Sequence, residues 1–328
     1  MKSNLCLLFV AGLLCLTALI SGCGGQSGAV VPGSRTVVDV ASNGLAYDSV
    51  RNRIWSTVGN TGNFANSIVA IDPATGAITK SISIGAEPNL ICITDNGQFA
   101  YVSVSADGTV RRVNLSSGKV TLKITTGTLV TMCDVPSLPH TFLGGVNPNA
   151  GVSVSAYDDD VRRTGTGAGG DFIRMASSTV MYGTGSTSLV KCTLSPGLIT
   201  WNSQTENLID AEFGIHSGLL YDANGHVVNP TTLSTVGQLP TVHFLPNGRH
   251  IAVSDSDNRA YIITWDFSSN KQLLCYDLTT LAELPQRDTG PVPGGAFDIV
   301  ACGNHTVAFR DYGAIVEPNK VFILRNLP

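Results

Sequence analysis

The amino-acid sequence predicts an all-β fold made of seven similar sheets, and three observations lead to that prediction. A strand followed by a turn recurs 42 residues further on, so that Asp72 corresponds to Asn114 and Gly76 to Gly118. Short runs of alternating apolar and polar residues are separated by Asx-Gly turns, which is typical of hairpins. No stretch has the 3.6-residue apolar period of an amphipathic helix, so we expect almost no helix.

The repeat also predicts how the sheets are arranged. The 294 residues from Arg35 to Pro328 hold seven units of 42 residues. A four-stranded antiparallel sheet cannot bury its faces alone, so such sheets stack around an axis as the blades of a propeller. We expect residues 35–40 to complete the last blade beside residues 321–324, which removes open sheet edges. The predicted blades cover residues 42–84, 85–126, 127–171, 172–208, 209–239, 240–284 and 285–328.

Within the blades, the unit of strand and turn at 67–76 and 108–118 has a third copy at 271–281. A strand pattern lies before each copy. These three predicted strands are 53–58, 99–104 and 249–254.

Composition limits the classes of function. Charged residues make up 13% of the chain and hydrophobic residues 43%, which excludes a disordered or polyelectrolyte chain. The formal net charge is −4, so no basic surface is expected and nucleic acid is excluded as a predicted partner.

The first residues indicate export. Met1 and Lys2 precede an apolar run at 5–20 that is too short to cross a membrane comfortably. The run ends in Ile20-Ser21-Gly22-Cys23, which resembles the lipobox of bacterial lipoproteins. That resemblance implies a signal peptide at 1–22, cleavage between Gly22 and Cys23, and lipidation of Cys23. The alternative is an ordinary signal peptide with an incidental cysteine.

Residues 23–34 form the predicted lipidated tether, because their small and polar side chains are typical of a flexible linker. Gly24 stands where the inner-membrane retention signal of enteric bacteria would have aspartate. By that rule, the protein would be anchored to an outer membrane. The propeller domain would follow at 35–328.

The remaining cysteines are predicted to be buried apolar residues with few or no disulfide bonds. Two of them lie 41 residues apart at matching points of the repeat, and none has the spacing of a CxxC motif. These five residues are Cys92, Cys133, Cys192, Cys275 and Cys302.

The segment at 90–102, followed by a Val-x-x-Val-Asn/Asp-x-x-x-Gly strand, resembles the YVTN-type propeller repeats of bacterial surface and periplasmic proteins. Two blades match well, although 57–59 and 103–105 lack the asparagine that usually follows the strand. Residues 70–76 also resemble the quinoprotein repeat, but that repeat has a docking tryptophan about four residues further on, and 77–80 contain none. A WD40 repeat is disfavoured because its signature occurs only once, as Gly225-His226 with Trp265-Asp266.

Two kinds of charged cluster are candidate sites. The carboxylates of Asp158, Asp159 and Asp160 are oxygen ligands suited to Ca²⁺. However, residues 153–163 echo residues 103–112, which favours an ordinary solvated hairpin turn. The same interpretation applies to the acidic turn at 255–258.

Paired arginines on neighbouring blades would suit a carboxylate or phosphate if one of each pair faced a shared groove. The favoured interpretation is instead that they serve surface solubility or form salt bridges with Asp107 and with the acids at 158–160. The four arginines are Arg111, Arg112, Arg162 and Arg163.

No spacing indicates a metal site among the six histidines, and the sequence has no nucleophile elbow or P-loop. The sequence therefore favours a non-catalytic, lipid-anchored envelope module that binds a protein or a glycan. We expect no cofactor, with Ca²⁺ or another divalent ion as the one candidate. The alternative resembles the propeller lactonases, which would hydrolyse a lactone or ester with a bound divalent metal at the channel mouth. A purely structural surface-layer or adhesion role is a variant of the first hypothesis.

Overall fold

The computed structural model describes residues 34–328 apart from short segments, and statements below concern the described residues. The predicted signal peptide and residues 23–33 of the predicted tether therefore lie outside them. No described helix is long and apolar enough to cross a membrane. The segments left out are 128–129, 136–137, 139, 147–152, 166, 169–171, 185–187, 207–208, 210–211, 241–248, 266–270 and 312–318.

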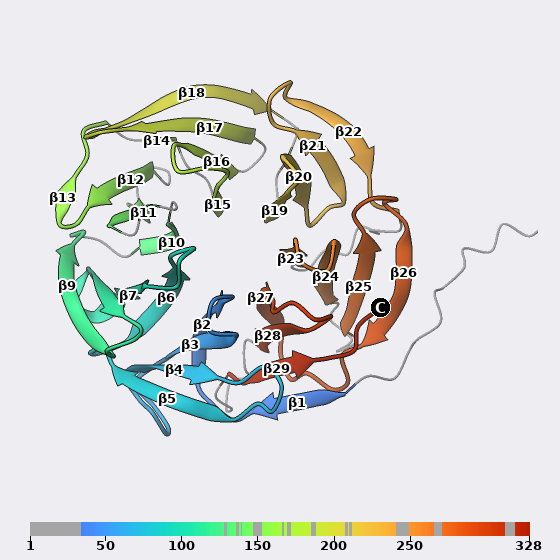
Figure 1. Ribbon diagram of the computed structural model, residues 1–328, viewed down its shortest axis with the longest axis horizontal. Coiled ribbons are helices and arrows are strands. Elements are labelled where there is room, and N and C mark those ends of the chain that lie inside the picture. Colours follow the sequence, from blue (N-terminus) through green and yellow to red (C-terminus); the bar gives the residue numbers. More distant parts are fainter. Residues whose placement is uncertain are drawn as a thin grey trace, which may run out of the picture.

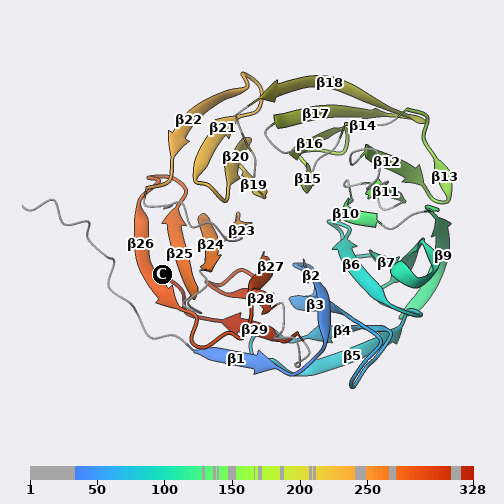
Figure 2. The ribbon, with the colours of Figure 1, turned by 180° about the vertical axis from the view of Figure 1, so that it is seen from behind.

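Seven antiparallel sheets surround one axis, as Figures 1 and 2 show from opposite sides. Each has four strands in a row, which confirms the predicted seven-bladed propeller. The one helical element described is a 3₁₀ turn at Ser105–Asp107, in agreement with the expected scarcity of helix.

The first three blades run from the axis outward in chain order. Blade 1 contains β2 (Ser42–Asp48), β3 (Arg53–Val58), β4 (Ser67–Ile71) and β5 (Ile78–Ser83). Blade 2 contains β6 (Pro88–Ile93), β7 (Phe99–Val104), β8 (Thr109–Asn114) and β9 (Lys119–Thr125). Blade 3 contains β10 (Val130–Asp134), β11 (Thr141–Val146), β12 (Ser153–Asp158) and β13 (Val161–Arg162), with the short β14 (Gly167–Ala168) also paired to β12.

The next three blades repeat this order. Blade 4 contains β15 (Phe172–Met175), β16 (Val180–Thr184), β17 (Ser188–Ser195) and β18 (Leu198–Glu206). Blade 5 contains β19 (Phe213–His216), β20 (Leu219–Asp222), β21 (His226–Asn229) and β22 (Ser234–Gln238). Blade 6 contains β23 (Arg249–Ser254), β24 (Arg259–Trp265), β25 (Lys271–Asp277) and β26 (Glu283–Asp288).

Blade 7 closes the ring with strands from both ends of the domain. It contains β27 (Ala296–Ala301), β28 (Val307–Asp311), β29 (Val321–Leu324) and, outermost, β1 (Arg35–Val38). β1 pairs antiparallel with β29, so that Arg35 lies opposite Leu324 and Val38 opposite Val321. The predicted closure by an N-terminal strand is confirmed.

Two details of the predicted blades are wrong. The boundary at 284 falls inside β26, which continues to Asp288, because the first strand of blade 6 begins only at Arg249. The strand predicted at 249–254 exists, but it is the first strand of its blade, whereas those at 53–58 and 99–104 are second strands. A local sequence pattern identifies a strand but does not show its position in the blade. The strand equivalent to β3 and β7 is β24, the second strand of blade 6.

The 42-residue repeat arises from the turn between the third and fourth strands. The side chains of Asp72 and Asn114 accept hydrogen bonds from backbone N–H groups two or three residues further along the chain. The turn ends in the left-handed region at Gly76, with φ +77°, and at Gly118, with φ +71°. Blades 5 and 6 form the same turn from Asn229 and Asp277, with leucine at the left-handed position.

We expect Gly76→Ala to destabilise the protein more than Gly62→Ala does. Both glycines have φ near +75°, so alanine is strained at either position by about 1 kcal/mol. A Cβ at Gly76 would also lie 2.5 Å from the Cγ2 of Thr36 in the closing strand, whereas at Gly62 nothing lies within 4 Å. Urea denaturation should show a loss of about 2–3 kcal/mol for Gly76→Ala and about 1 kcal/mol for Gly62→Ala. Equal losses would contradict the predicted contact with β1.

Apolar clusters fill the spaces between neighbouring blades. One joins Ile54 and Val69 of blade 1 to Val38 and Ile323 of blade 7, and so buries the closure. The described cysteines belong to these interiors: Cys92, Cys192, Cys275 and Cys302 are buried, and the latter two are free thiols. Burial raises the pKa of the Cys275 thiol to about 12, so it packs as a neutral, apolar group. The side chain of Cys133 is outside the described part of the chain.

Candidate functional site

Three of the four arginines singled out from sequence form ion pairs with Asp107, Asp158 or Asp159, in line with the salt bridges expected. Arg111 contacts Asp107 at 2.8 Å and donates to the carbonyl of Ile84 at 2.9 Å. Arg163 holds both oxygens of Asp158, at 2.7 and 2.8 Å. This fork lowers the pKa of the Asp158 carboxyl.

Arg112, which is nearly buried, joins blade 2 to blade 3. Its guanidinium contacts the carboxylate of Asp159 and lies 2.8 Å from Nδ1 of His140, above the ring of Phe99. Contacts with His140 and Arg112 lower the pKa of Asp159. Arg162 and Asp160 are exposed.

The predicted equivalence between residues 103–112 and 153–163 is wrong. The turn at 105–108 joins the second and third strands of blade 2, whereas Asp159 and Asp160 join the third strand of blade 3 to its fourth. The two turns therefore lie at opposite ends of their strands, because consecutive hairpins point in opposite directions. Arg112 and Arg163 bind the adjacent carboxylates of Asp159 and Asp158, and a carboxylate or phosphate ligand at the arginines stays a prediction.

The three aspartates do not converge either. Asp158 turns to an arginine of its own blade, and Asp159 to an arginine of blade 2. Among the described residues, no group of three His, Cys, Asp or Glu side chains is placed to hold a metal ion. Ca²⁺ at this turn remains a prediction.

Four histidines instead meet one carboxylate each, with the imidazole Nδ1 between 2.5 and 3.0 Å from a carboxylate oxygen. Sequence analysis missed these pairs because three of them join residues at least 19 positions apart, with no motif to mark them. His243 lies outside the described residues. The pairs are His140 with Asp159, His216 with Asp255, His226 with Asp222 and His250 with Glu212.

One of these pairs belongs to a charged bridge beside the axis. Arg174 of β15 and His250 of β23 contact the two oxygens of Glu212, at 3.0 and 2.7 Å. Glu212, only 7% exposed, precedes β19, so the bridge joins the innermost strands of blades 4, 5 and 6 (Figure 1). Burial alone would lower the pKa of His250, but the hydrogen bond and charge of Glu212 raise it above 6.5 overall.

On the opposite side of the ring lies a pocket with a volume of about 490 Å³. It lies where β2 and β6 begin and where β3 and β7 end. Asn319, two residues before β29, supplies one wall of the pocket. We call it the asparagine pocket. Its lining includes Asn43, Asn60, Glu87, Asn89, Ser105 and Asn319, and no histidine, cysteine or basic residue among the described residues.

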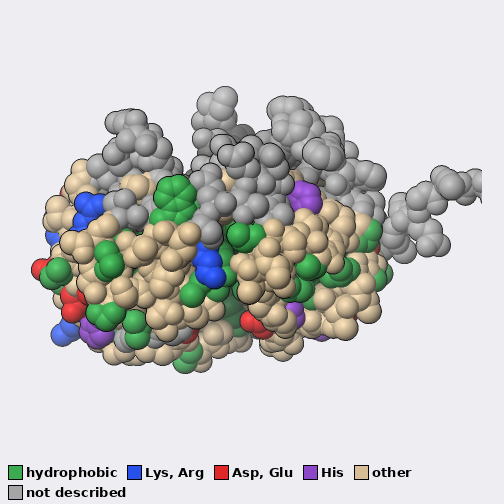
Figure 3. Space-filling model, turned by 90° about the horizontal axis from the view of Figure 1, so that it is seen from above, with side chains coloured by type: hydrophobic (Ala, Val, Ile, Leu, Met, Phe, Trp, Pro, Cys, Tyr) green, Lys and Arg blue, Asp and Glu red, His purple; other side chains and the backbone are tan. Residues whose placement is uncertain are grey.

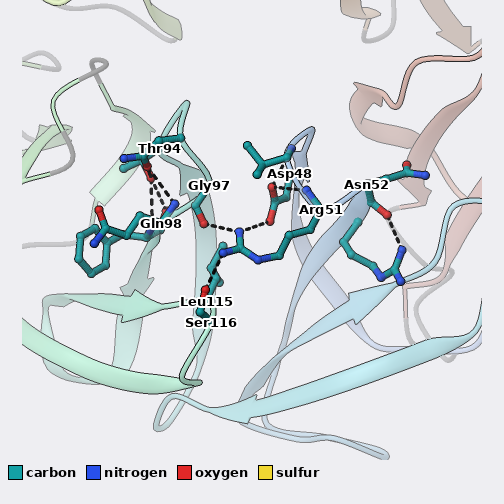
Figure 4. Close-up of polar contacts among 12 residues, drawn as sticks. Asp48, Arg51, Asn52, Thr94, Gly97, Gln98, Leu115 and Ser116 are labelled. Atoms are coloured by element: carbon teal, nitrogen blue, oxygen red, sulfur yellow. Dashed lines mark hydrogen bonds and ion pairs between the residues drawn. The ribbon is translucent and has the colours of Figure 1, made fainter.

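A second pocket, of about 310 Å³, lies between blades 1 and 2 at the other end of the strands. Figure 4 shows its main cation, Arg51, held by the Asp48 carboxylate at 2.9 Å, the carbonyl of Gly97 and the hydroxyl of Ser116. Lys80 donates to the carbonyls of Leu115 and Ser116. Arg51 and Lys80 of blade 1 therefore bind atoms of blade 2, and their role is to hold the two blades together.

The side of the disc in Figure 3 has no single charged surface: lysine, arginine and acidic side chains lie singly or in small groups among polar and hydrophobic ones. The asparagine pocket, whose lining is mostly polar, is the candidate ligand site.

Comparison with known proteins supports the class of fold alone. No family model and no curated protein matches the chain. The β-propeller domain of Myceliophteria thermophila Cps50 (Swd1) superposes with a TM-score of 0.67 at 11% identity, covering 88% of this chain and 99% of that one. The WD40 repeats of RRP9 give 0.66 at 12% identity, covering 92% and 99%, and U3-55K gives 0.63 at 12%, covering 91% and 100%.

The chain is thus a seven-bladed β-propeller with a WD40-like fold. This holds although the WD40 sequence signature occurs only once in it.

Proposed function

We propose that the chain is a lipid-anchored propeller of a bacterial envelope that binds a protein or glycan without catalysing a reaction. The asparagine pocket is the observation that carries this proposal. Its described lining offers amides, hydroxyls and one carboxylate, which recognise ligands through hydrogen bonds, and no residue suited to act as a nucleophile with its base. The WD40-like neighbours are consistent with a role as an interaction module.

The proposed anchor is Cys23, which follows the lipobox, and the tether would reach β1 at Arg35. Because β1 is the outermost strand of blade 7, the tether would leave the rim of the ring and not its axis. Neither mouth would then be blocked by the anchor. A metal-dependent hydrolase has less support, because each histidine–carboxylate pair described here contributes a single histidine.

The anchor and the binding site can be tested in one experiment. A photo-crosslinking amino acid at Asn60, an exposed residue of the pocket, should form a specific adduct in native membranes. The same group at Val236, exposed on the outer strand of blade 5, is the matched control. Cys23→Ala should abolish the lipid on the amino-terminal peptide and release the protein from membranes. Identical adducts at both positions, or an unlipidated wild-type protein that stays soluble, would contradict the proposal.

A further inference from the structure

The asparagine pocket has its amide groups oriented by the protein's own backbone. The Nδ2 of Asn43 donates to the carbonyl of Pro88 at 3.0 Å, and the Nδ2 of Asn319 donates to the carbonyl of Ser42 at 2.9 Å. Gly59 leaves room for the first amide, since a Cβ there would lie 3.0 Å from this nitrogen. With each nitrogen engaged, the Oδ1 atoms remain as acceptors for a ligand.

Glu87 adds a carboxylate whose position is also determined by the backbone. Its φ is +57°, which is strained for glutamate. Its N–H donates to Oδ1 of Asn66 at 3.1 Å, and its carbonyl accepts from the N–H of Ser105 at 3.0 Å. Asn60 donates to one carboxylate oxygen at 3.2 Å, and the other oxygen remains an acceptor.

The loop that supplies Asn60 to the pocket also carries an exposed aromatic ring. Asn66 closes the loop at 59–66 by donating to the carbonyl of Gly59, and its own carbonyl accepts from the N–H groups of Ile84 and Gly85. Phe64, near the end of this loop, is 43% exposed and has φ +62°. An apolar ring is thus held on the loop that also supplies Asn60 to the pocket.

We propose that this pocket binds a neutral glycan. The inference rests on the function proposed above and names its ligand. Amide and carboxylate oxygens from blades 1, 2 and 7 offer hydrogen-bond acceptors at several places around the pocket. The hydroxyls of a sugar are hydrogen-bond donors that are likewise distributed around a ring, so the two match. The exposed ring of Phe64 suits the apolar face of a sugar ring. A lysine side chain is disfavoured as the ligand, because its ammonium group needs acceptors gathered around one point. An acidic glycan is disfavoured because Glu87 would repel it and the described lining holds no cation to offset that repulsion.

The test uses the full-length Cys23→Ala chain and calorimetric titration with maltotriose, cellotriose and chitotriose. Trigalacturonic acid and pentalysine are the charged comparison ligands. At least one neutral trisaccharide should bind and the charged ligands should not. Glu87→Gln should weaken binding about fivefold, as expected when a charged acceptor is replaced by a neutral amide, and Phe64→Ala by about three- to tenfold. Asp160→Asn, an exposed carboxylate on blade 3, should leave affinity unchanged.

Thermal melting of each variant shows whether it is folded, so that a loss of binding is assigned to the site. Binding of pentalysine in place of sugars, or no binding of any of the three trisaccharides, would overturn the inference. So would sugar binding that neither Glu87→Gln nor Phe64→Ala weakens. If the Asn60 crosslink still captures a partner in those cases, the proposed function stands and only the glycan is excluded.

Discussion

A chain that begins at Val40 is expected to be far less stable than one that begins at Ser34. The shorter chain lacks β1, which forms four residue pairs with β29 and buries Val38. It also loses the Arg35 guanidinium, which lies 4.8 Å from the centre of the Phe322 ring. At about 1 kcal/mol for each hydrogen bond and about 2 kcal/mol for a buried valine, the loss should be roughly 5 kcal/mol.

Urea denaturation of the two chains measures this difference. The shorter chain should also aggregate, because β29 becomes an open edge of blade 7. A synthetic peptide of residues 34–39 should restore part of the stability, since it binds only the folded ring. Equal midpoints for the two chains would show that blade 7 is stable with three strands, contrary to the closure described here.

Replacing Glu212 by alanine should cause the second-largest loss, about 2–4 kcal/mol, because it removes the common carboxylate of His250, which is nearly buried, and of Arg174, which is partly exposed. The loss should depend on pH. The folded-state pKa of His250 is raised above 6.5, so its stabilising effect is complete below that value and disappears as the pH rises through the folded-state pKa. The variant should therefore differ most from the wild type near pH 5 and least near pH 9.

Urea denaturation at pH 5, 7 and 9 checks both size and direction. His250→Gln should remove most of the pH dependence while Arg174 keeps its ion pair with Glu212. Asp160→Ala, at an exposed position, is the control and should change stability little at any of these pH values. A constant difference between the wild type and Glu212→Ala across the three pH values would show that His250 is not the group responsible.

The outcome for the turns illustrates how far local sequence reaches. Asp72 and Asn114 identify the same turn in blades 1 and 2 because an Asx side chain bonds to its own backbone within three residues. The same reasoning failed at 153–163, where a similar run of residues forms the other kind of hairpin. The sequence of a hairpin turn is similar whichever pair of strands it joins. The turn between second and third strands is therefore distinguished from the turn between third and fourth strands only by counting the strands of the blade.

By itself, the sequence determined the repeat, the seven blades and the closing strand, because alternation, turn residues and repeat length are local properties. Only the tertiary structure decided the contacts between blades. Glu212 meets its two partners 38 residues away on either side, and Asn319 meets Ser42 across 277 residues. Such pairs arise from the rotation of one blade onto the next and from ring closure, which bring side chains together without leaving a periodic pattern in the chain.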